Sequence, residues 1–303
     1  MEQNFETCLY NVVDAAKVQK DEPMKKHTTF RIGGPADYFI MPSNEKELAE
    51  TIRVCREFSI PIYIVGNGSN LLVGDKGFRG AIIQLYKSMG TFQVEGNQIT
   101  AQAGCSLAQI ANAALDAALT GFEFAAGIPG TLGGAVVMNA GAYGGEMKDV
   151  LTSVRVMTEE GEIMELPAEE LGLGYRTSII PEKRYIVLGA VISLTEGKKE
   201  EIKAQMDDLR QKRVSKQPLE YPSAGSTFKR PEGYFAGKLI QDAGLRGFQV
   251  GGAQVSEKHC GFVINKDQAT ASDVMNLMNQ VSDKVYEEFG VRLQPEVKRL
   301  GEF

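Results

Sequence analysis

Glycine is concentrated in one stretch of the chain, and few folds accept such a stretch. Residues 126–146 read AGIPGTLGGAVVMNAGAYGGE, and seven of these twenty-one residues are glycine. A glycine inside a regular element costs about 0.5–1 kcal/mol relative to alanine. Here the glycines are interleaved with Val136, Val137 and Met138, which indicates backbone packed inside the protein against something flat. We therefore do not expect a flexible loop.

The composition is that of a globular protein without a general affinity for polyanions. The chain has 303 residues, enough for two or three domains of about 100–200 residues each. Its net charge of −6 argues against non-specific attraction to nucleic acid or to an anionic membrane surface. We expect small-molecule partners, no nucleic acid and no membrane, and an anionic substrate then needs a local cluster of lysine and arginine.

Cysteine and histidine usage argues against several kinds of site. The four cysteines form no C-x-x-C pair, and the first residues show no secretory signal. No run approaches the ~18 apolar residues of a membrane span, so we expect a cytoplasmic monomer with free thiols. The two histidines, His27 and His259, lie in no H-E-x-x-H motif, so we expect no histidine-based zinc site and no other metal.

The hydrophobic pattern alternates between strands and helices along the whole chain. In the first part of the chain we expect a strand over 36–42, a helix over about 45–58 capped by Ser43 or Asn44, a strand from 61 that ends in a polar turn, and a strand over 80–85. In the part that follows we expect a hairpin over 91–103 that turns at 95–97, and a helix that begins at Ser106 and is ended by Gly121. A second hairpin over 154–166 and a strand over 185–194 complete the first two thirds. Strand, helix and strand at the first spacing indicate a βαβ unit.

The last third begins with a lysine- and glutamate-rich segment. We expect a polar helix over 195–213, a short helix over 236–245, a strand over 259–265 and an amphipathic helix capped by Ser272 with Gly290 after its end. The polar helix is typical of the entry to a new domain.

Two glycine turns are candidates for binding an anion: GNGSN over 66–70 and GIPGTLGG over 127–134. Consecutive unobstructed backbone N–H groups form concave nests that hold phosphate, and each hydrogen bond to a charged group contributes about 1.5–3 kcal/mol. Neither turn is a P-loop, and Leu71 stands where a dinucleotide fingerprint has its third glycine. A plain tight turn explains GNGSN equally well, but two such turns together suit the pyrophosphate of a dinucleotide.

Three polar residues attract attention only in combination. Arg176 lies in GYRTSII, Ser226 lies in PSAGSTFKRP, and Glu296 follows Pro295 near the C-terminus. Taken singly, they are typical of a surface arginine, a turn serine and a solvated carboxylate. Composition and spacing do not select them.

Together, these segments resemble one enzyme family. HTTFRIGGPADYF, GNGSNLLV, AGIPGTLGGAVVMNAGAYGGE, GYRTS, AGSTFKRP, AGKLIQDAGLRG and LQPEVKRLG occur in this order. The set resembles the UDP-N-acetylenolpyruvoylglucosamine reductases, bacterial flavoenzymes of peptidoglycan synthesis, over about residues 23–301. Only fifty positions separate Arg176 from Ser226, so the chain resembles the shorter class, which lacks an insertion with a substrate-covering tyrosine.

The resemblance implies an α+β fold with a two-subdomain FAD-binding region of the vanillyl-alcohol-oxidase/PCMH type and a C-terminal α+β substrate-binding domain. The implied domains are FAD-binding subdomain 1 over 1–86, FAD-binding subdomain 2 over 87–200 and the substrate-binding domain over 201–296, with a strand in 297–303 returning to subdomain 1.

The resemblance also assigns roles to residues of this chain. It implies FAD contacts from Gly66, Asn67, Gly68, Ser69, Asn70, Gly127, Ile128, Pro129, Gly130, Thr131, Gly133, Gly134, Asn139, Ala140, Gly141 and Ala142. It implies that Arg176, Ser226 and Glu296 are catalytic and that Tyr175 and Lys229 lie near the substrate.

The implied reaction is the NADPH-dependent reduction of UDP-N-acetylglucosamine enolpyruvate to UDP-N-acetylmuramate through non-covalent FAD. Hydride from flavin N5 would reach the vinyl carbon, and Ser226 would supply the proton. Arg176 would pair with the substrate carboxylate, and a protonated Glu296 would hydrogen-bond the oxygen on which charge develops.

Two other interpretations remain open. A flavin oxidase of the wider group often attaches FAD through histidine, and only His27 precedes His259 here. A non-catalytic nucleotide-binding protein would show the same bound-cofactor spectrum. Neither explains why GYRTS, AGSTFKRP and QPEVK occur together.

Overall fold

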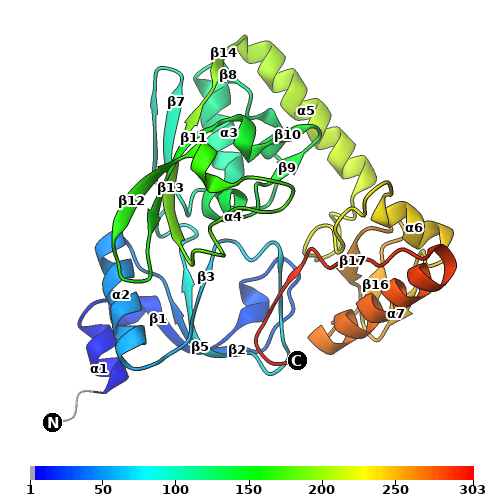
Figure 1. Cartoon of the computed structure of the whole chain (residues 1–303), viewed down its shortest axis with the longest axis horizontal. Helices are drawn as coiled ribbons and strands as arrows, with labels where there is room; N and C mark the ends of the chain where they lie inside the picture. Colours follow the sequence, from blue (N-terminus) through cyan, green and yellow to red (C-terminus); the bar gives the residue numbers. More distant parts are fainter. Residues whose placement is uncertain (1–3) are drawn as a thin grey trace. The chain divides into compact units, whose positions relative to one another are not determined.

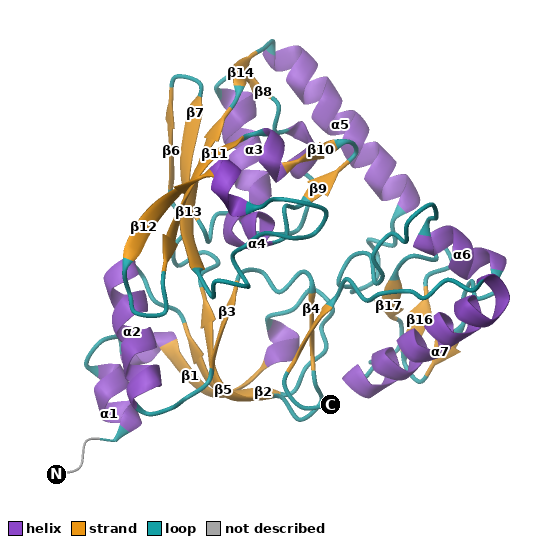
Figure 2. Cartoon of the chain, viewed as in Figure 1, coloured by secondary structure: helices purple, strands orange, loops and turns teal. Residues whose placement is uncertain are grey.

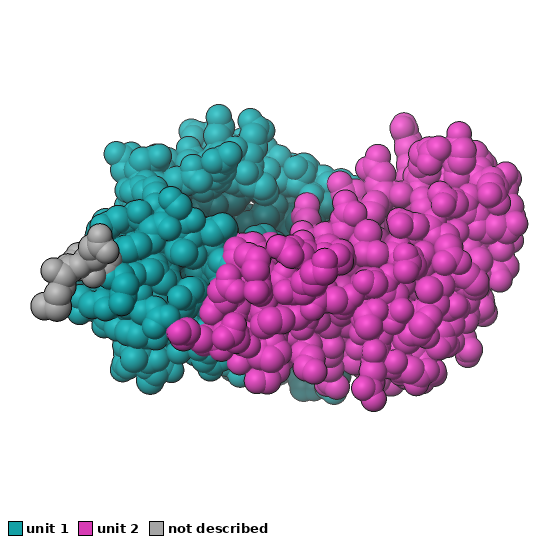
Figure 3. Space-filling model, turned by 90° about the horizontal axis from the view of Figure 1, so that it is seen from below, with its two compact units in different colours: residues 1–19, 38–67, 80–212 teal, residues 20–37, 68–79, 213–303 magenta. Residues whose placement is uncertain are grey.

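The computed structural model of the chain describes residues 4–303. These residues form two compact units, coloured separately in Figure 3. Unit 1 holds the segments up to residue 19, 38–67 and 80–212, and unit 2 holds 20–37, 68–79 and 213–303. Within residues 4–303, no helix is both long enough and apolar enough to span a bilayer.

The largest sheet belongs to unit 1 and has five antiparallel strands in the order β12-β11-β13-β7-β6. Its strands are β6 (Phe92–Glu95), β7 (Gln98–Gln102), β11 (Leu151–Met157), β12 (Ile163–Pro167) and β13 (Ile186–Ser193). Both predicted hairpins are confirmed. Glu95 pairs with Gln98 around Gly96, whose φ of +57° suits glycine, and Met157 pairs with Ile163.

Two helices pack on this sheet. α3 (Leu107–Asp116) contacts β6 and β7, and α4 (Leu132–Val137) contacts β7 and β13 (Figure 1). α3 begins as predicted: the Ser106 hydroxyl accepts a hydrogen bond from the Gln109 N–H, and the Gln109 side chain accepts one from the Ser106 N–H. This reciprocal capping satisfies two N–H groups that a helix start leaves without partners.

The predicted end of α3 was wrong. The helix ends at Asp116, and Ala118 turns the chain with a φ of +56° before the short strand β8 (Leu119–Thr120). Gly121 also has a positive φ, +116°, but it follows β8 and serves the next turn. A non-glycine residue therefore took the left-handed position that the sequence pattern assigned to glycine.

The predicted βαβ unit is confirmed. α2 (Glu45–Glu57) connects β2 (Pro35–Ile40) to β3 (Ile62–Val65), and β3 pairs in parallel with β5 (Phe78–Gln84). With β1 (Val18–Pro23), these strands form a sheet of order β1-β2-β5-β3.

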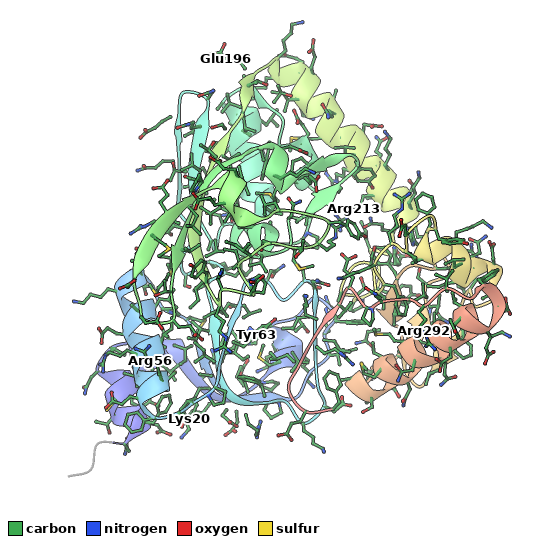
Figure 4. The ribbon with its side chains drawn as sticks, viewed as in Figure 1. Lys20, Arg56, Tyr63, Glu196, Arg213 and Arg292 are labelled. Carbon is green, nitrogen blue, oxygen red and sulfur yellow. The ribbon has the colours of Figure 1, made fainter. Side chains whose placement is uncertain are left out.

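Of the two candidate caps of α2, Asn44 is the one used. Its side-chain oxygen accepts a hydrogen bond from the Glu47 N–H at 2.9 Å. One face of α2, which includes Leu48, Ile52 and Cys55, is buried. At the other end, the Arg56 guanidinium, labelled in Figure 4, donates to the carbonyl oxygen of Glu159 at 2.9 Å. This contact links α2 to the turn between β11 and β12.

Unit 2 has its own small sheet and its own core. The elements of the sheet and its helices are β15 (Gln249–Val250), β16 (Ala253–Val255), β17 (Val263–Asn265), α6 (Ala236–Asp242) and α7 (Ala271–Phe289). α7 packs on β15 and β16 through buried side chains that include Val274, Leu277 and Val281. Separately, β18 (Lys298–Leu300) pairs in parallel with β4 (Leu71–Val73).

The cap predicted for α7 was wrong by two residues. Thr270, not Ser272, is the cap: its hydroxyl accepts from the Asp273 N–H, and the Asp273 carboxylate accepts from the Thr270 N–H. Ser272 lies in the first turn and donates to the carboxylate of Asp75, which also accepts from its N–H. Gly290 ends the helix with a φ of +68°, as predicted.

The predicted polar helix is confirmed as α5 (Lys199–Lys216), a single long helix in Figure 2. It buries only Ile202, and ion pairs such as Lys203 with Asp207 run along its surface at i,i+4 spacing. The remaining elements are α1 (Phe5–Tyr10), β9 (Gly141–Ala142), β10 (Gly145–Glu146), β14 (Thr195–Glu196) and the 3-10 turns η1 (Ala15–Lys17), η2 (Met24–Lys26), η3 (Glu123–Ala125), η4 (Met147–Asp149) and η5 (Ala168–Leu171).

We predict that Asp273→Ala lowers the free energy of unfolding by about 0.5–2 kcal/mol at neutral pH, because it removes half of a capping box. The Thr270 backbone N–H, together with that of Gly252, holds the pKa of Asp273 below its ordinary value of 3.8. A lowered folded-state pKa gives stability that is present above pH 3.8 and is lost as the pH falls through the folded-state value. Urea unfolding from neutral to acid pH should therefore show the difference from the native chain shrinking, whereas the exposed Asp267→Ala control should change little at any pH.

Candidate active site

The glycine-rich segment is anchored by backbone hydrogen bonds to the residues before and at the start of α3. The Leu107 N–H donates to the Gly130 carbonyl, the Leu132 N–H donates to the Cys105 carbonyl, and the Gly133 N–H donates to the Ala103 carbonyl. From Leu132 the segment becomes the six-residue helix α4, which the sequence analysis did not predict. The interpretation as packed backbone rather than a flexible loop is confirmed.

The glycines of this segment serve two different purposes. A Cβ on Gly133 would lie 2.9 Å from the Ala103 Cβ, and one on Gly145 would lie 2.7 Å from the Phe124 ring. These glycines are required by the protein's own packing. Gly134 differs: it is exposed, its φ is not positive, and the nearest atom to a Cβ would be the Thr131 hydroxyl oxygen at 3.8 Å. Nothing in the described chain requires glycine there, so the open space is suited to a ligand.

The two predicted glycine turns meet within unit 1. The Asn67 side-chain amide donates to the Pro129 carbonyl oxygen at 2.8 Å. A Cβ on Gly66 would lie 2.1 Å from the Thr131 hydroxyl oxygen, so only glycine permits this approach. Residues 66–67 of the first turn and residues 129–131 of the second turn therefore form one backbone surface, as a pyrophosphate site requires.

The rest of the first turn lies in unit 2. Gly68 has a φ of +61°, and its carbonyl accepts from the Thr29 N–H. A Cβ on Gly68 would lie 2.2 Å from the His27 carbonyl oxygen. Asn70 donates from its side-chain amide to the carbonyl oxygen of Glu296 at 3.2 Å. A predicted cofactor residue and a predicted catalytic residue are thus in direct contact.

Ser226, Lys229 and Glu296 come together in unit 2. Phe228 and Pro295 form an antiparallel bridge; on its two sides the Glu296 N–H donates to the Thr227 carbonyl, and the Lys229 N–H donates to the Gln294 carbonyl. Ser226 is exposed at the end of this pairing, whereas the neighbouring Thr227 is buried. The glutamate, which lies about seventy positions after the serine and the lysine in the sequence, is thus held on a segment hydrogen-bonded to theirs.

Arg176 lies in unit 1, in a tight turn with a φ of +54°. Its guanidinium donates to the Gly141 carbonyl oxygen at 3.3 Å and lies 5.2 Å from the centre of the Tyr175 ring. Tyr175 itself is 54% exposed. The structure therefore places the predicted catalytic arginine against Gly141, one of the residues predicted to bind the cofactor.

Asn139 departs from the simplest form of its predicted role. It is completely buried, and its side chain donates to Glu146 and to the Gly174 carbonyl and accepts from the Lys148 N–H. Because the protein uses these side-chain groups, the FAD contact predicted for Asn139 would have to come from its backbone. No role was predicted for Glu146. The feature that could have indicated one is that it is a single carboxylate at the end of a run of glycines.

None of the four cysteines forms a disulfide, and two of them are poor nucleophiles. Burial raises the pKa of the Cys55 thiol to about 12 and that of the Cys105 thiol to about 11. A thiol must ionise to act as a nucleophile. These two buried thiols therefore do not support chemistry based on a cysteine.

Family models match two parts of the chain. Residues 36–167 match an FAD-binding domain, and residues 217–300 match the C-terminal domain of UDP-N-acetylenolpyruvoylglucosamine reductase. The protein of that name from Agathobacter rectalis is 55% identical, with all of both chains covered. The chain belongs to this family.

Solved structures agree with this assignment. The crystal structure of the Thermus caldophilus reductase matches with a TM-score of 0.81 and 37% identity, covering 93% of this chain and 98% of that one. The grass pollen allergen Phl p 4, a glucose dehydrogenase, is 16% identical with a TM-score of 0.51 over 65% of this chain and shows a shared fold only. The family member described here is thus an α+β, FAD-dependent oxidoreductase with an FAD-binding domain, and it acts in peptidoglycan precursor reduction.

We predict that Gly134→Val gives a folded protein that has lost most of its FAD. Valine fits the described chain at this exposed helical position and is not a worse helix former than glycine. Filling a cofactor's space costs about 1–3 kcal/mol, which weakens binding about 10–100-fold. Flavin absorbance per protein and the unfolding midpoint of the apoprotein measure the two effects. Ala108→Val, at an exposed position of α3, is the matched control. Equal flavin loss in both variants would contradict the assignment of the open space at Gly134 to the cofactor.

Proposed function

We propose that the chain catalyses the NADPH-dependent reduction of UDP-N-acetylglucosamine enolpyruvate to UDP-N-acetylmuramate. The pairing of the segment Ser226–Lys229 with Gln294–Glu296 carries the proposal, because it holds the backbones of the three predicted residues Ser226, Lys229 and Glu296 on two hydrogen-bonded segments. The names of the family's members and the anchored glycine turns support the same reaction. FAD held by the glycine turns 66–70 and 127–134 would supply the redox chemistry, namely hydride transfer from NADPH to the vinyl carbon of the substrate.

Arg176 binds and orients the substrate carboxylate in this proposal. A guanidinium presents a planar fork of N–H donors that matches a carboxylate, and the pair strengthens as negative charge grows on the carboxylate oxygens. The aromatic ring of Tyr175 beside the guanidinium supports its orientation. Hydride addition at the vinyl carbon sends charge toward these oxygens, so stabilisation by Arg176 increases along the reaction.

Glu296 assists at the same developing charge by hydrogen-bonding, in its protonated form, to an oxygen of the intermediate. Its backbone is held on both sides: its N–H donates to Thr227, and its carbonyl accepts from the side chain of Asn70. A residue whose backbone is fixed in this way needs less reorganisation during the reaction.

Ser226 supplies the proton that completes the reduction. Its hydroxyl is a weak acid, but the carbanionic carbon next to the carboxylate is a strong base. The hydroxyl proton moves to that carbon, and Lys229, three residues on, returns a proton to the serine oxygen or binds a phosphate of the nucleotide. Among the predicted residues of unit 2, Ser226 is the exposed one with a hydroxyl at the end of the paired segments.

The division into domains is part of the proposal. Residues 1–86 and 87–200 would be the two FAD-binding subdomains, and 201–296 the substrate domain, with the C-terminal strand returning to the first. The parallel pairing of β18 with β4 supports the return of the C-terminus, since β4 lies at residues 71–73.

The overall reaction is tested under anaerobic conditions with the purified holoenzyme. NADPH should bleach the visible flavin spectrum, and UDP-N-acetylglucosamine enolpyruvate should restore it with formation of UDP-N-acetylmuramate. Recovery only with O₂ would favour a flavin oxidase, and bleaching without recovery would exclude this substrate.

We predict that Ser226→Ala retains bleaching by NADPH but reoxidises about 10²–10⁴-fold more slowly with the enolpyruvyl substrate. The reason is that only the second half-reaction needs the proton. Stopped-flow absorbance separates the two half-reactions. Ser282→Ala, in α7 of the same unit, is the control and should reoxidise normally. If both half-reactions slowed equally in Ser226→Ala, the serine would have a structural role instead.

A further inference from the structure

The glycine-rich segment holds the turn of Arg176 at three alternate residues. We call residues Gly174–Thr177 the arginine turn. The Ser178 hydroxyl, directly after this turn, donates to the Val137 carbonyl oxygen at 2.8 Å. The Asn139 amide donates to the carbonyl oxygen of Gly174, the first residue of the turn, at 3.1 Å. The Arg176 guanidinium itself donates to the Gly141 carbonyl oxygen at 3.3 Å.

The turn is closed by backbone hydrogen bonds of its own. Gly174 and Thr177 exchange two long backbone hydrogen bonds, 3.2 and 3.3 Å, which close a loop of four residues. Arg176 has a φ of +54°, a region that non-glycine residues rarely occupy and that costs free energy unless the surroundings enforce it. The segment 137–141 supplies three contacts that help to enforce it.

Asn139 is built for holding rather than for contact with a ligand. It is completely buried and itself has a positive φ of +40°, which asparagine tolerates better than most residues. Its amide group donates to the Glu146 carboxylate at 2.8 Å and its carbonyl accepts from the Lys148 N–H at 2.9 Å, so both ends are fixed. Glu146 in turn pairs with the Lys148 ammonium. The amide that reaches Gly174 is thus locked in one orientation.

We propose that Asn139 and Ser178 are positioning residues that fix Arg176 for the substrate carboxylate. This inference rests on the proposed function, in which Arg176 binds that carboxylate. Neither residue touches the substrate. They act by holding the two ends of the arginine turn against residues 137–139, which follow the glycine turn 127–134 that is predicted to bind the cofactor. An arginine displaced by about 1 Å can cost up to about 100-fold in rate.

Ser178→Ala is the first test, because it removes a single hydroxyl and leaves the backbone conformation unchanged. We expect normal flavin content, normal bleaching by NADPH and reoxidation by the enolpyruvyl substrate that is about 10–100-fold slower. Ser193→Ala is the matched control. Ser193 lies on β13 of the same unit, and its hydroxyl also forms a hydrogen bond, in this case with the hydroxyl of Thr152. The control should behave as the native chain in both half-reactions.

A double-mutant cycle with Arg176→Ala distinguishes positioning from general destabilisation. The dissociation constant of the enolpyruvyl substrate is read from the change it causes in the oxidised flavin spectrum, which needs no turnover. Ser178→Ala should weaken binding when Arg176 is present and have no further effect in the Arg176→Ala background, because coupled residues are not additive. Equal weakening in both backgrounds, or native reoxidation in Ser178→Ala, would overturn the proposal.

Asn139→Gly tests the second contact. Glycine accepts the positive φ and removes the amide, so reoxidation should slow at least as much as in Ser178→Ala while bleaching persists. If this variant fails to fold, the Ser178 cycle decides alone. Failure of the proposed function is recognised separately: the native enzyme would then show no reoxidation by the enolpyruvyl substrate at all.

Discussion

The structure of the site depends on the backbone hydrogen bonds between residues 130–133 and residues 103–107. These bonds hold a glycine-rich segment in an ordered form although it has few side chains of its own to pack. Gly133 is needed because the two backbones approach so closely that a Cβ would meet Ala103. The entropic cost of glycine is thus offset by close backbone packing, which also leaves the space at Gly134 open on the exposed side.

The same segment serves two chemical tasks in succession. Its first half offers backbone and open space, which suit a flat cofactor with a pyrophosphate. Its second half, from Val137 to Gly141, offers carbonyl oxygens and one buried amide, which hold the turn of Arg176. In the proposed function, the arginine that binds the substrate carboxylate is attached to the same segment that offers open space for the cofactor, so the position of Arg176 depends on the position of that segment.

Much of the fold could be predicted from the sequence, because hydrophobic period and turn chemistry are local. The βαβ unit, both hairpins and the start of α3 follow from such signals. The errors arose where long-range contacts decided between similar local choices. Thr270 and Ser272 are both good caps, but Asp75, far away in the sequence, takes the hydroxyl of Ser272. Helix α4 was missed because glycine disfavours helices in isolation, and packing against the sheet outweighs that preference.

Prediction of the candidate site from the sequence is limited in the same way, because its residues depend on long-range contacts. Single residues such as Ser226 and Glu296 carry no local signal, and only their order along the chain suggested a role. What the sequence could not show is that Asn139 turns its amide inward. An asparagine in a glycine-rich stretch is equally consistent with a ligand contact or a turn. Here its role is decided by hydrogen bonds to Glu146, Lys148 and Gly174, whose positions depend on the folded loop. A buried amide with every group bonded to protein marks a scaffold, and it explains why the residue that orients the arginine need not touch the substrate.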